Sequence, residues 1–223
     1  MRPALRCLPD ACSELELVGW RAAGDTGRMS EHVDLAPSAE RLAGLLPGVS
    51  DEHFSGPTPN EGRTVGQLLQ HIVRLTAAFR AAADKDFGPW TDTSPDANGW
   101  PELEEGWRQT LAERLPTLAA AWSSPAAWEG MTRAGGIDLP GAIAGLVALG
   151  EITLHGWDLA RATGQDYHCD EATATALEEF VQGFDAGGTP GLFGPAVEPP
   201  EGAGRFERAL ARSGRDPKWS PNG

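Results

Sequence analysis

Cysteine is scarce in this chain of 223 residues. The three cysteines are Cys7, Cys12 and Cys169, which is an odd number and too few for the disulfide framework of a small secreted domain. Cys7 and Cys12 also lack the C-x-x-C spacing of a zinc-binding pair, and no second pair accompanies them. We therefore expect reduced thiols in a cytoplasmic protein.

Long apolar runs and positive charge are lacking as well. The longest apolar run covers 12 residues, 139–150, whereas a membrane-spanning helix needs about 20, so we expect no transmembrane segment. Lysine and arginine number 18 against 32 aspartates and glutamates, which leaves a net charge of −14. A surface of this sign disfavours nucleic acid and anionic membranes as partners.

A sustained hydrophobic period is missing from residues 1–28. Basic residues near the start resemble a signal peptide, but Pro3, Pro9, Asp10 and Glu14 break the apolar segment that such a peptide needs. We interpret residues 1–28 as a disordered or spurious extension ahead of Met29. Residues 29–223 are then expected to form a single domain.

Beyond this segment the apolar residues recur at helical spacing. Thr64 and Gln67 form a capping box at the start of one helix. Pro101 stands at a first-turn position of another, which Pro116 is expected to kink or interrupt. Alternating apolar residues around two glycines predict a short hairpin within 128–139. The expected helices cover residues 35 to about 47, 64 to about 84, 101–122, 140–163, 171–184 and 202–213. This pattern indicates an all-α bundle.

The helix expected at 140–163 carries the most informative residues. Its first half is the apolar run, and a helix that is apolar all round is usually buried. Glu151 and His155 follow one turn apart, about 40° apart around the axis, and Asp158 returns to within about 20° of Glu151. A buried carboxylate is costly unless it is paired or bound to a metal. A divalent cation held by Glu151 and His155 would satisfy this requirement.

His71 extends this pair to a possible ligand set. It lies on the apolar face of the helix that begins at residue 64. Taken alone, His71 is more often a core histidine, and Glu151 with His155 can be explained as a hydrogen bond without a metal. Taken together, the three residues are the ligands expected where bundle helices converge. Two histidines and one carboxylate leave a fourth position open, as in catalytic zinc sites. Asp158 is interpreted as a group that orients a ligand imidazole or relays protons, with a pairing to Arg161 as the alternative.

The remaining histidines are not expected in the site. His32 and His53 lie in a helix approach and in a polar loop, where they are expected to be solvated. His168 adjoins Cys169, but adjacent residues do not share a face there, which argues against a joint metal role.

Two segments resemble a known family. Residues 64–73 (TVGQLLQHIV) are similar to the first ligand helix, and residues 151–160 (EITLHGWDLA) to the second ligand segment, of the actinobacterial DinB-like metal-binding family. Residues 192–195 (LFGP) and 214–217 (GRDP) look like closing motifs of that family. The branch includes the mycothiol-dependent maleylpyruvate isomerase.

The resemblance implies a DinB/YfiT-like four-helix bundle with long loops and a short C-terminal helix. It also implies a divalent metal, typically zinc, with His71, Glu151 and His155 at the ligand positions and Asp158 at the position of an acidic residue near the site. The expected function is thiol-dependent transfer or isomerisation of a small electrophile, with mycothiol or another low-molecular-weight thiol as cofactor. The isomerase has a C-terminal domain with a catalytic arginine, and we expect none here, so maleylpyruvate isomerisation is not carried over.

Two other functions remain open from the sequence. One is a metal-dependent hydrolase in which metal-bound water is the nucleophile. The other is a metal-binding or interaction bundle without turnover. Either a monomer or a homodimer is compatible with the chain.

Overall fold

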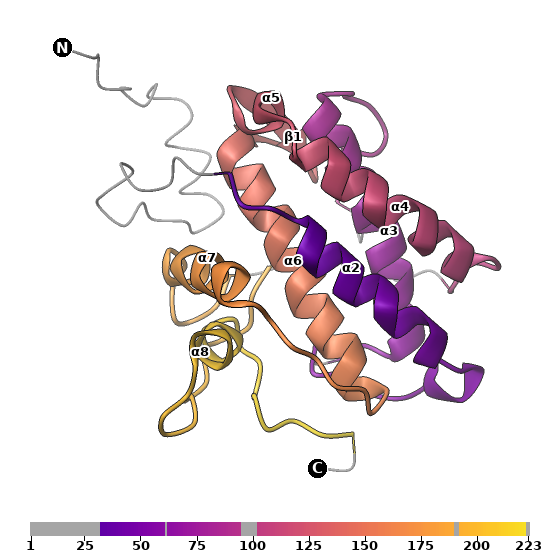
Figure 1. Ribbon diagram of the computed structural model, residues 1–223, viewed down its shortest axis with the longest axis vertical. Coiled ribbons are helices and arrows are strands. Elements are labelled where there is room, and N and C mark those ends of the chain that lie inside the picture. The colour runs from indigo at the N-terminus through magenta and orange to yellow at the C-terminus, as the bar shows by residue number, and fades with distance from the viewer. Residues whose placement is uncertain (1–31, 61, 95–101, 190–191, 222–223) are drawn as a thin grey trace.

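The computed structural model describes residues 32–60, 62–94, 102–189 and 192–221. The extension expected at residues 1–28, with Cys7 and Cys12, lies outside these ranges. Four helices form a bundle in which α3 and α2 each pack against both α4 and α6 (Figure 1). These helices are α2 (Ala36–Leu45), α3 (Val65–Asp84), α4 (Trp107–Trp122) and α6 (Gly141–Ala162). The predicted all-α four-helix bundle is therefore confirmed.

Capping at Thr64 starts α3 as the sequence predicts. The Thr64 hydroxyl accepts a hydrogen bond from the Gln67 amide at 3.3 Å, and the Gln67 side chain accepts one from the Thr64 amide at 3.0 Å. Both bonds satisfy amides that the first helical turn leaves without partners. The loop before α3 contains two short 3-10 helices, Leu46–Gly48 directly after α2 and Asp51–His53.

The start of α4 differs from the prediction. The helix begins at Trp107, and residues 102–106 lie outside it. Gln70 of α3 explains the difference, because its side chain donates to the Glu104 carboxylate at 3.1 Å and accepts from the Glu104 amide at 3.0 Å. The Gln70 side chain is fully buried, and its amide group would be costly to leave without hydrogen-bond partners. The non-helical segment around Glu104 supplies those partners.

Pro116 lies within a continuous α4, so the interruption is wrong, and the kink given as its alternative stays a prediction. It lies on the exposed side of the helix, together with Ala112, whose carbonyl loses its usual amide donor to the proline. Water can satisfy a carbonyl on that side, so the helix continues.

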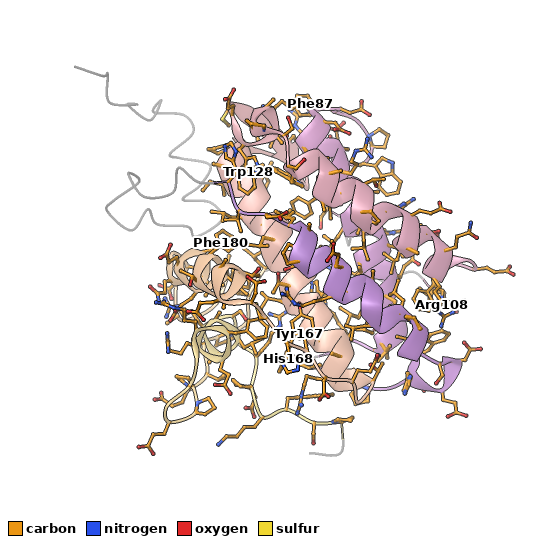
Figure 2. The ribbon with its side chains drawn as sticks, in the orientation of Figure 1. Phe87, Arg108, Trp128, Tyr167, His168 and Phe180 are labelled. Atoms are coloured by element: carbon orange, nitrogen blue, oxygen red, sulfur yellow. The ribbon has the colours of Figure 1, made fainter. Side chains whose placement is uncertain are left out.

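A short helix and a hairpin lead into α6. The helix α5 (Pro125–Trp128) is followed by β1 (Met131–Ala134) and β2 (Ile137–Pro140), which pair antiparallel as expected for residues 128–139. Trp128 packs directly on α6, because a Cβ at Gly145 would lie only 2.5 Å from its ring. Figure 2 shows Trp128 beside the first turns of α6. Gly145 thus allows the indole to fix the start of the site-bearing helix.

Two shorter helices lie beside α6 and pack against each other, namely α7 (Glu171–Gln182) and α8 (Arg205–Arg212) (Figure 1). Asp170 caps α7, since its carboxylate accepts from the Thr173 amide at 2.9 Å, and it pairs with Arg41 of α2 at 2.8 Å. The buried Glu178 of α7 accepts hydrogen bonds from two arginines of α8, and these bonds link the two helices. Within the described ranges, no helix combines the length and the apolar character that a membrane crossing requires.

Candidate metal centre

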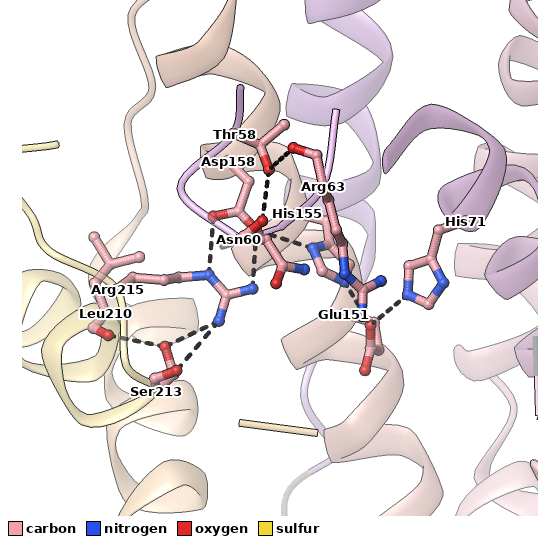
Figure 3. A network of polar contacts seen from close by, with 10 residues as sticks. All are labelled: Thr58, Asn60, Arg63, His71, Glu151, His155, Asp158, Leu210, Ser213 and Arg215. Carbon is pink, nitrogen blue, oxygen red and sulfur yellow. Dashed lines mark hydrogen bonds and ion pairs between the residues drawn. The ribbon is translucent and has the colours of Figure 1, made fainter. Parts of the chain in front are cut away.

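Helices α3 and α6 bring the three predicted ligands together (Figure 3). The Nε2 atom of His155 lies 3.0 Å from Oε2 of Glu151, and Nε2 of His71 lies 3.7 Å from the same oxygen. One ligand atom from each residue fits within a group whose members are all within 4.8 Å of one another. Among the described residues this is the one such group of histidine, cysteine and acidic side chains.

The three side chains are shielded from water. The exposed fractions are 8% for His71, 7% for His155 and 16% for Glu151. Burial on its own raises the pKa of Glu151, but the hydrogen bond from His155 and the nearby imidazole of His71 outweigh it and hold the pKa below its usual range. Glu151 is therefore a carboxylate at neutral pH, as a metal ligand must be.

Asp158 fixes the second nitrogen of His155. Its Oδ2 lies 2.9 Å from Nδ1 of His155, and a carboxylate can only accept, so Nδ1 carries the proton of this bond. The opposite nitrogen, Nε2, then faces Glu151 and His71. This is the arrangement in which a carboxylate orients a ligand histidine, one of the two roles that the sequence suggests for Asp158.

Arg215 is the partner of Asp158 that sequence reasoning missed. Its Nε donates to Oδ1 at 2.9 Å and its Nη2 to Oδ2 at 2.8 Å. Burial alone raises the pKa of Asp158, but the charge of Arg215 and the hydrogen bonds from His155 and Arg215 keep it below its usual range. The alternative partner, Arg161, instead donates to the carbonyl of Trp219 at 3.0 and 2.6 Å.

A narrow pocket lies against the site. Its interior is about 10 Å³, roughly the space that one water molecule occupies. Its wall is mainly apolar, with polar groups contributed by Glu151, His155 and Arg215. The lining residues are Val147, Gly150, Glu151, Leu154, His155, Phe180, Leu192, Phe193 and Arg215. Figure 2 shows Phe180 on α7, beside α6. A bound molecule would therefore meet aliphatic and aromatic groups on most sides.

The other described histidines lie apart from this group. His53 accepts a hydrogen bond from the Ser50 amide through Nδ1 at 3.0 Å, and His32 stacks on Trp128 with ring centroids 5.4 Å apart. His168 is exposed, and burial raises the pKa of its neighbour Cys169 to about 12, which makes this thiol a poor ligand at neutral pH.

The three residues suit a divalent metal by donor type and spacing. Nitrogen and carboxylate donors are typical of zinc, whose tetrahedral ligands are about 3.3 Å apart when the bonds are about 2.05 Å. The two contacts to Glu151, 3.0 and 3.7 Å, lie on either side of this value. The donor types and their spacing therefore fit a divalent metal.

Fold and site together define a helical bundle with a candidate metal centre between two of its helices. Residues 35–160 match the family model described as the mycothiol maleylpyruvate isomerase N-terminal domain. The match covers more than half of the chain, so the protein belongs to this family.

Individual relatives agree with that placement. Two uncharacterized proteins from strains of Mycobacterium tuberculosis are each 27% identical over 139 residues, which is 60% of this chain and 68% of the relative. The crystal structure of the mycothiol-dependent maleylpyruvate isomerase has a TM-score of 0.53 at 19% identity, with 71% of this chain and 74% of that chain covered. A histidine-to-alanine mutant of that isomerase gives a TM-score of 0.52 at 18% identity. At these identities the structures are similar in fold.

Proposed function

We propose that the chain is a metal- and thiol-dependent enzyme, a transferase or isomerase that acts on a small electrophile. His71, Glu151 and His155 hold a divalent metal, zinc by donor type, and the thiol is mycothiol or a similar low-molecular-weight thiol. The observation that carries this proposal is the convergence of three ligand atoms within 4.8 Å of one another, from two buried histidines and one partly buried glutamate. Membership in a family named for a mycothiol-dependent isomerase supports the thiol.

The metal, when bound, would supply a Lewis acid that lowers the pKa of a thiol and stabilises the thiolate at neutral pH. Glu151 offsets part of the metal charge. With the proton on Nδ1 held by Asp158, His155 would bind a metal through Nε2 after releasing the proton that Nε2 donates to Glu151. Asp158 is fully buried and both of its oxygens are engaged, which favours the orienting role over a direct proton relay to substrate.

The pocket has room for about one water molecule, so its wall supports an apolar environment beside the ligand group rather than a seat for a whole substrate. Phe180, Phe193 and Leu154 line this pocket together with Glu151 and His155, and Arg215, which also lines it, is already bound to Asp158. Exclusion of water by such a wall strengthens the electrostatic interactions inside it, including the attraction between a bound metal and a thiolate.

Metal content tests the site. Elemental analysis of the purified protein should give one zinc per chain, and His71→Ala, Glu151→Gln and His155→Ala should each lose most of it. The exposed His168→Ala is the matched control and should retain the metal. Equal metal in all five proteins would refute the proposed ligands.

Thiol binding tests the reaction class. A cobalt-substituted sample should gain a sulfur-to-cobalt charge-transfer band in the near ultraviolet when mycothiol is added. A sample that holds cobalt and gains no band with mycothiol, or with any other small thiol, would rule out thiol activation. The hydrolase and the metal-binding bundle without turnover would then remain.

A further inference from the structure

We propose that Arg215 is a positioning residue of the metal centre, which it reaches through Asp158 and His155. The inference rests on the proposed metal site and extends it to the C-terminal part of the chain. Figure 3 shows the four groups in sequence, from Arg215 through Asp158 and His155 to Glu151.

The contacts form an unbroken chain of short polar bonds. Arg215 donates a hydrogen bond to each oxygen of Asp158, at 2.9 and 2.8 Å. One of these oxygens, Oδ2, is also the acceptor for Nδ1 of His155 at 2.9 Å. Nε2 on the far side of the same imidazole is the predicted ligand atom. A movement of the Asp158 carboxylate therefore moves the ligand nitrogen.

The geometry of Arg215 suits this task better than a simple point charge would. A guanidinium that bonds both oxygens fixes the plane of a carboxylate, whereas a lysine ammonium leaves it free to rotate. Asp158 is fully buried, so water cannot supply the missing restraint. His155 depends on this plane, because a hydrogen bond to an imidazole weakens when the acceptor turns away.

Arg215 is itself held firmly. Its backbone amide donates to the Leu210 carbonyl at 2.9 Å, and its Nη1 lies 3.3 Å from the Ser213 hydroxyl, which donates to the same carbonyl. Gly214 has a φ of 86°, and a Cβ at this residue would lie 2.9 Å from the backbone of Gly194. The turn that presents Arg215 is therefore packed against the segment whose Leu192 and Phe193 line the pocket.

Metal affinity measures the effect. In competition with a chromogenic chelator, Arg215→Met should bind zinc about 10 to 100 times more weakly than the wild type, as found for residues that orient metal ligands. The zinc affinity of Arg215→Lys should lie between those of Arg215→Met and the wild type. Lysine keeps the positive charge but cannot bond both carboxylate oxygens in a fixed plane. The visible spectrum of the cobalt protein should change in both variants, because the position of His155 changes.

Two comparisons separate positioning from general loss of structure. Arg161→Met releases the Trp219 carbonyl, which also belongs to the C-terminal segment, but does not touch Asp158; it should bind zinc as the wild type does. In an Asp158→Asn background, adding Arg215→Met should change the zinc affinity little, since the link to His155 is already altered. Circular dichroism checks the fold of each variant. If Arg215→Met does not fold, the zinc affinity of Arg215→Lys is compared with that of the wild type instead.

Three results would contradict the inference in distinguishable ways. The role of Arg215 would be overturned if Arg215→Met binds zinc with wild-type affinity and leaves the cobalt spectrum unchanged. If Arg215→Met does not fold, the same result in Arg215→Lys would overturn it. An equal loss of affinity in Arg161→Met would assign the effect to docking of the C-terminal segment as a whole. If the wild type binds neither zinc nor cobalt, the proposed metal site itself fails, and the positioning role fails with it.

Discussion

Two arginine–aspartate pairs in this protein have similar geometry and should differ sharply in their effect on stability. Arg215 bonds both oxygens of Asp158 inside the protein, and its side chain is 8% exposed. Arg133 bonds both oxygens of Asp138 on the hairpin, at 2.6 and 3.2 Å, with a side chain that is 36% exposed. We compare the replacement of each arginine by methionine.

The expected loss follows from what each change leaves behind. Arg215→Met leaves a fully buried carboxylate without its cation, which destabilises a protein by about 3–5 kcal/mol. Arg133→Met leaves its partner in contact with water, so the free energy of unfolding should hardly change. With a urea dependence of about 3 kcal/mol per molar, the midpoint of the Arg215→Met variant should fall by about 1–1.7 M.

The assay is urea unfolding followed by tryptophan fluorescence, with a chelator present so that metal binding does not contribute. The eight tryptophans of the chain provide the signal. Equal midpoints for the two variants would refute the reasoning, because they would mean that the Asp158 carboxylate tolerates burial without Arg215. A lower midpoint with a changed urea slope would instead indicate altered compactness and would require a second probe.

Three further changes test other parts of the structure. Gly145→Ala places a methyl group against the Trp128 ring and should destabilise the protein by about 1–3 kcal/mol in urea unfolding, whereas Gly44→Ala, with open space around it, should cause no loss. Cys169, whose pKa is raised to about 12 by burial, should react with iodoacetamide at pH 8 far more slowly in the folded protein than in urea, as followed by peptide mapping; equal rates would contradict this. The pKa of Asp170 is about 2, because hydrogen bonds from its own helix and from an arginine outweigh burial, so its charge stabilises the fold above about pH 4 and this stabilisation is lost as the pH falls towards 2. The melting-temperature difference between wild type and Asp170→Asn should therefore shrink over that range, and a constant difference would argue against it.

Local patterns were sufficient to predict the bundle and the ligand group. The capping box at Thr64 is a contact between residues three positions apart, so the sequence contains all of its information. Glu151 and His155 lie one turn apart on a helix that is buried along nearly its whole length, and that combination indicated a site. His71 joined them because it occupies the apolar face of its own helix.

Contacts between distant segments were not predictable in this way. The start of α4 depends on Gln70, which lies 34 positions before Glu104 and has no signal in the local pattern of residues 101–106. The partner of Asp158 is 57 positions away, whereas the local candidate, Arg161, is directed to the C-terminal chain. The Gly-Arg-Asp-Pro motif marked Arg215 as notable, but only the folded arrangement indicates what it touches.

The Asp158–Arg215 pair also bears on the order in which the protein folds. All three proposed ligands and Asp158 belong to residues 71–158, so the ribosome releases them well before Arg215. Until Arg215 docks, burial of α6 would enclose a carboxylate without its cation, which is unfavourable by several kcal/mol. Contacts of such long sequence separation also carry a loop-closure cost that contacts within one helix do not. We therefore expect the interior around the proposed ligands to close fully only after residue 215 has been made.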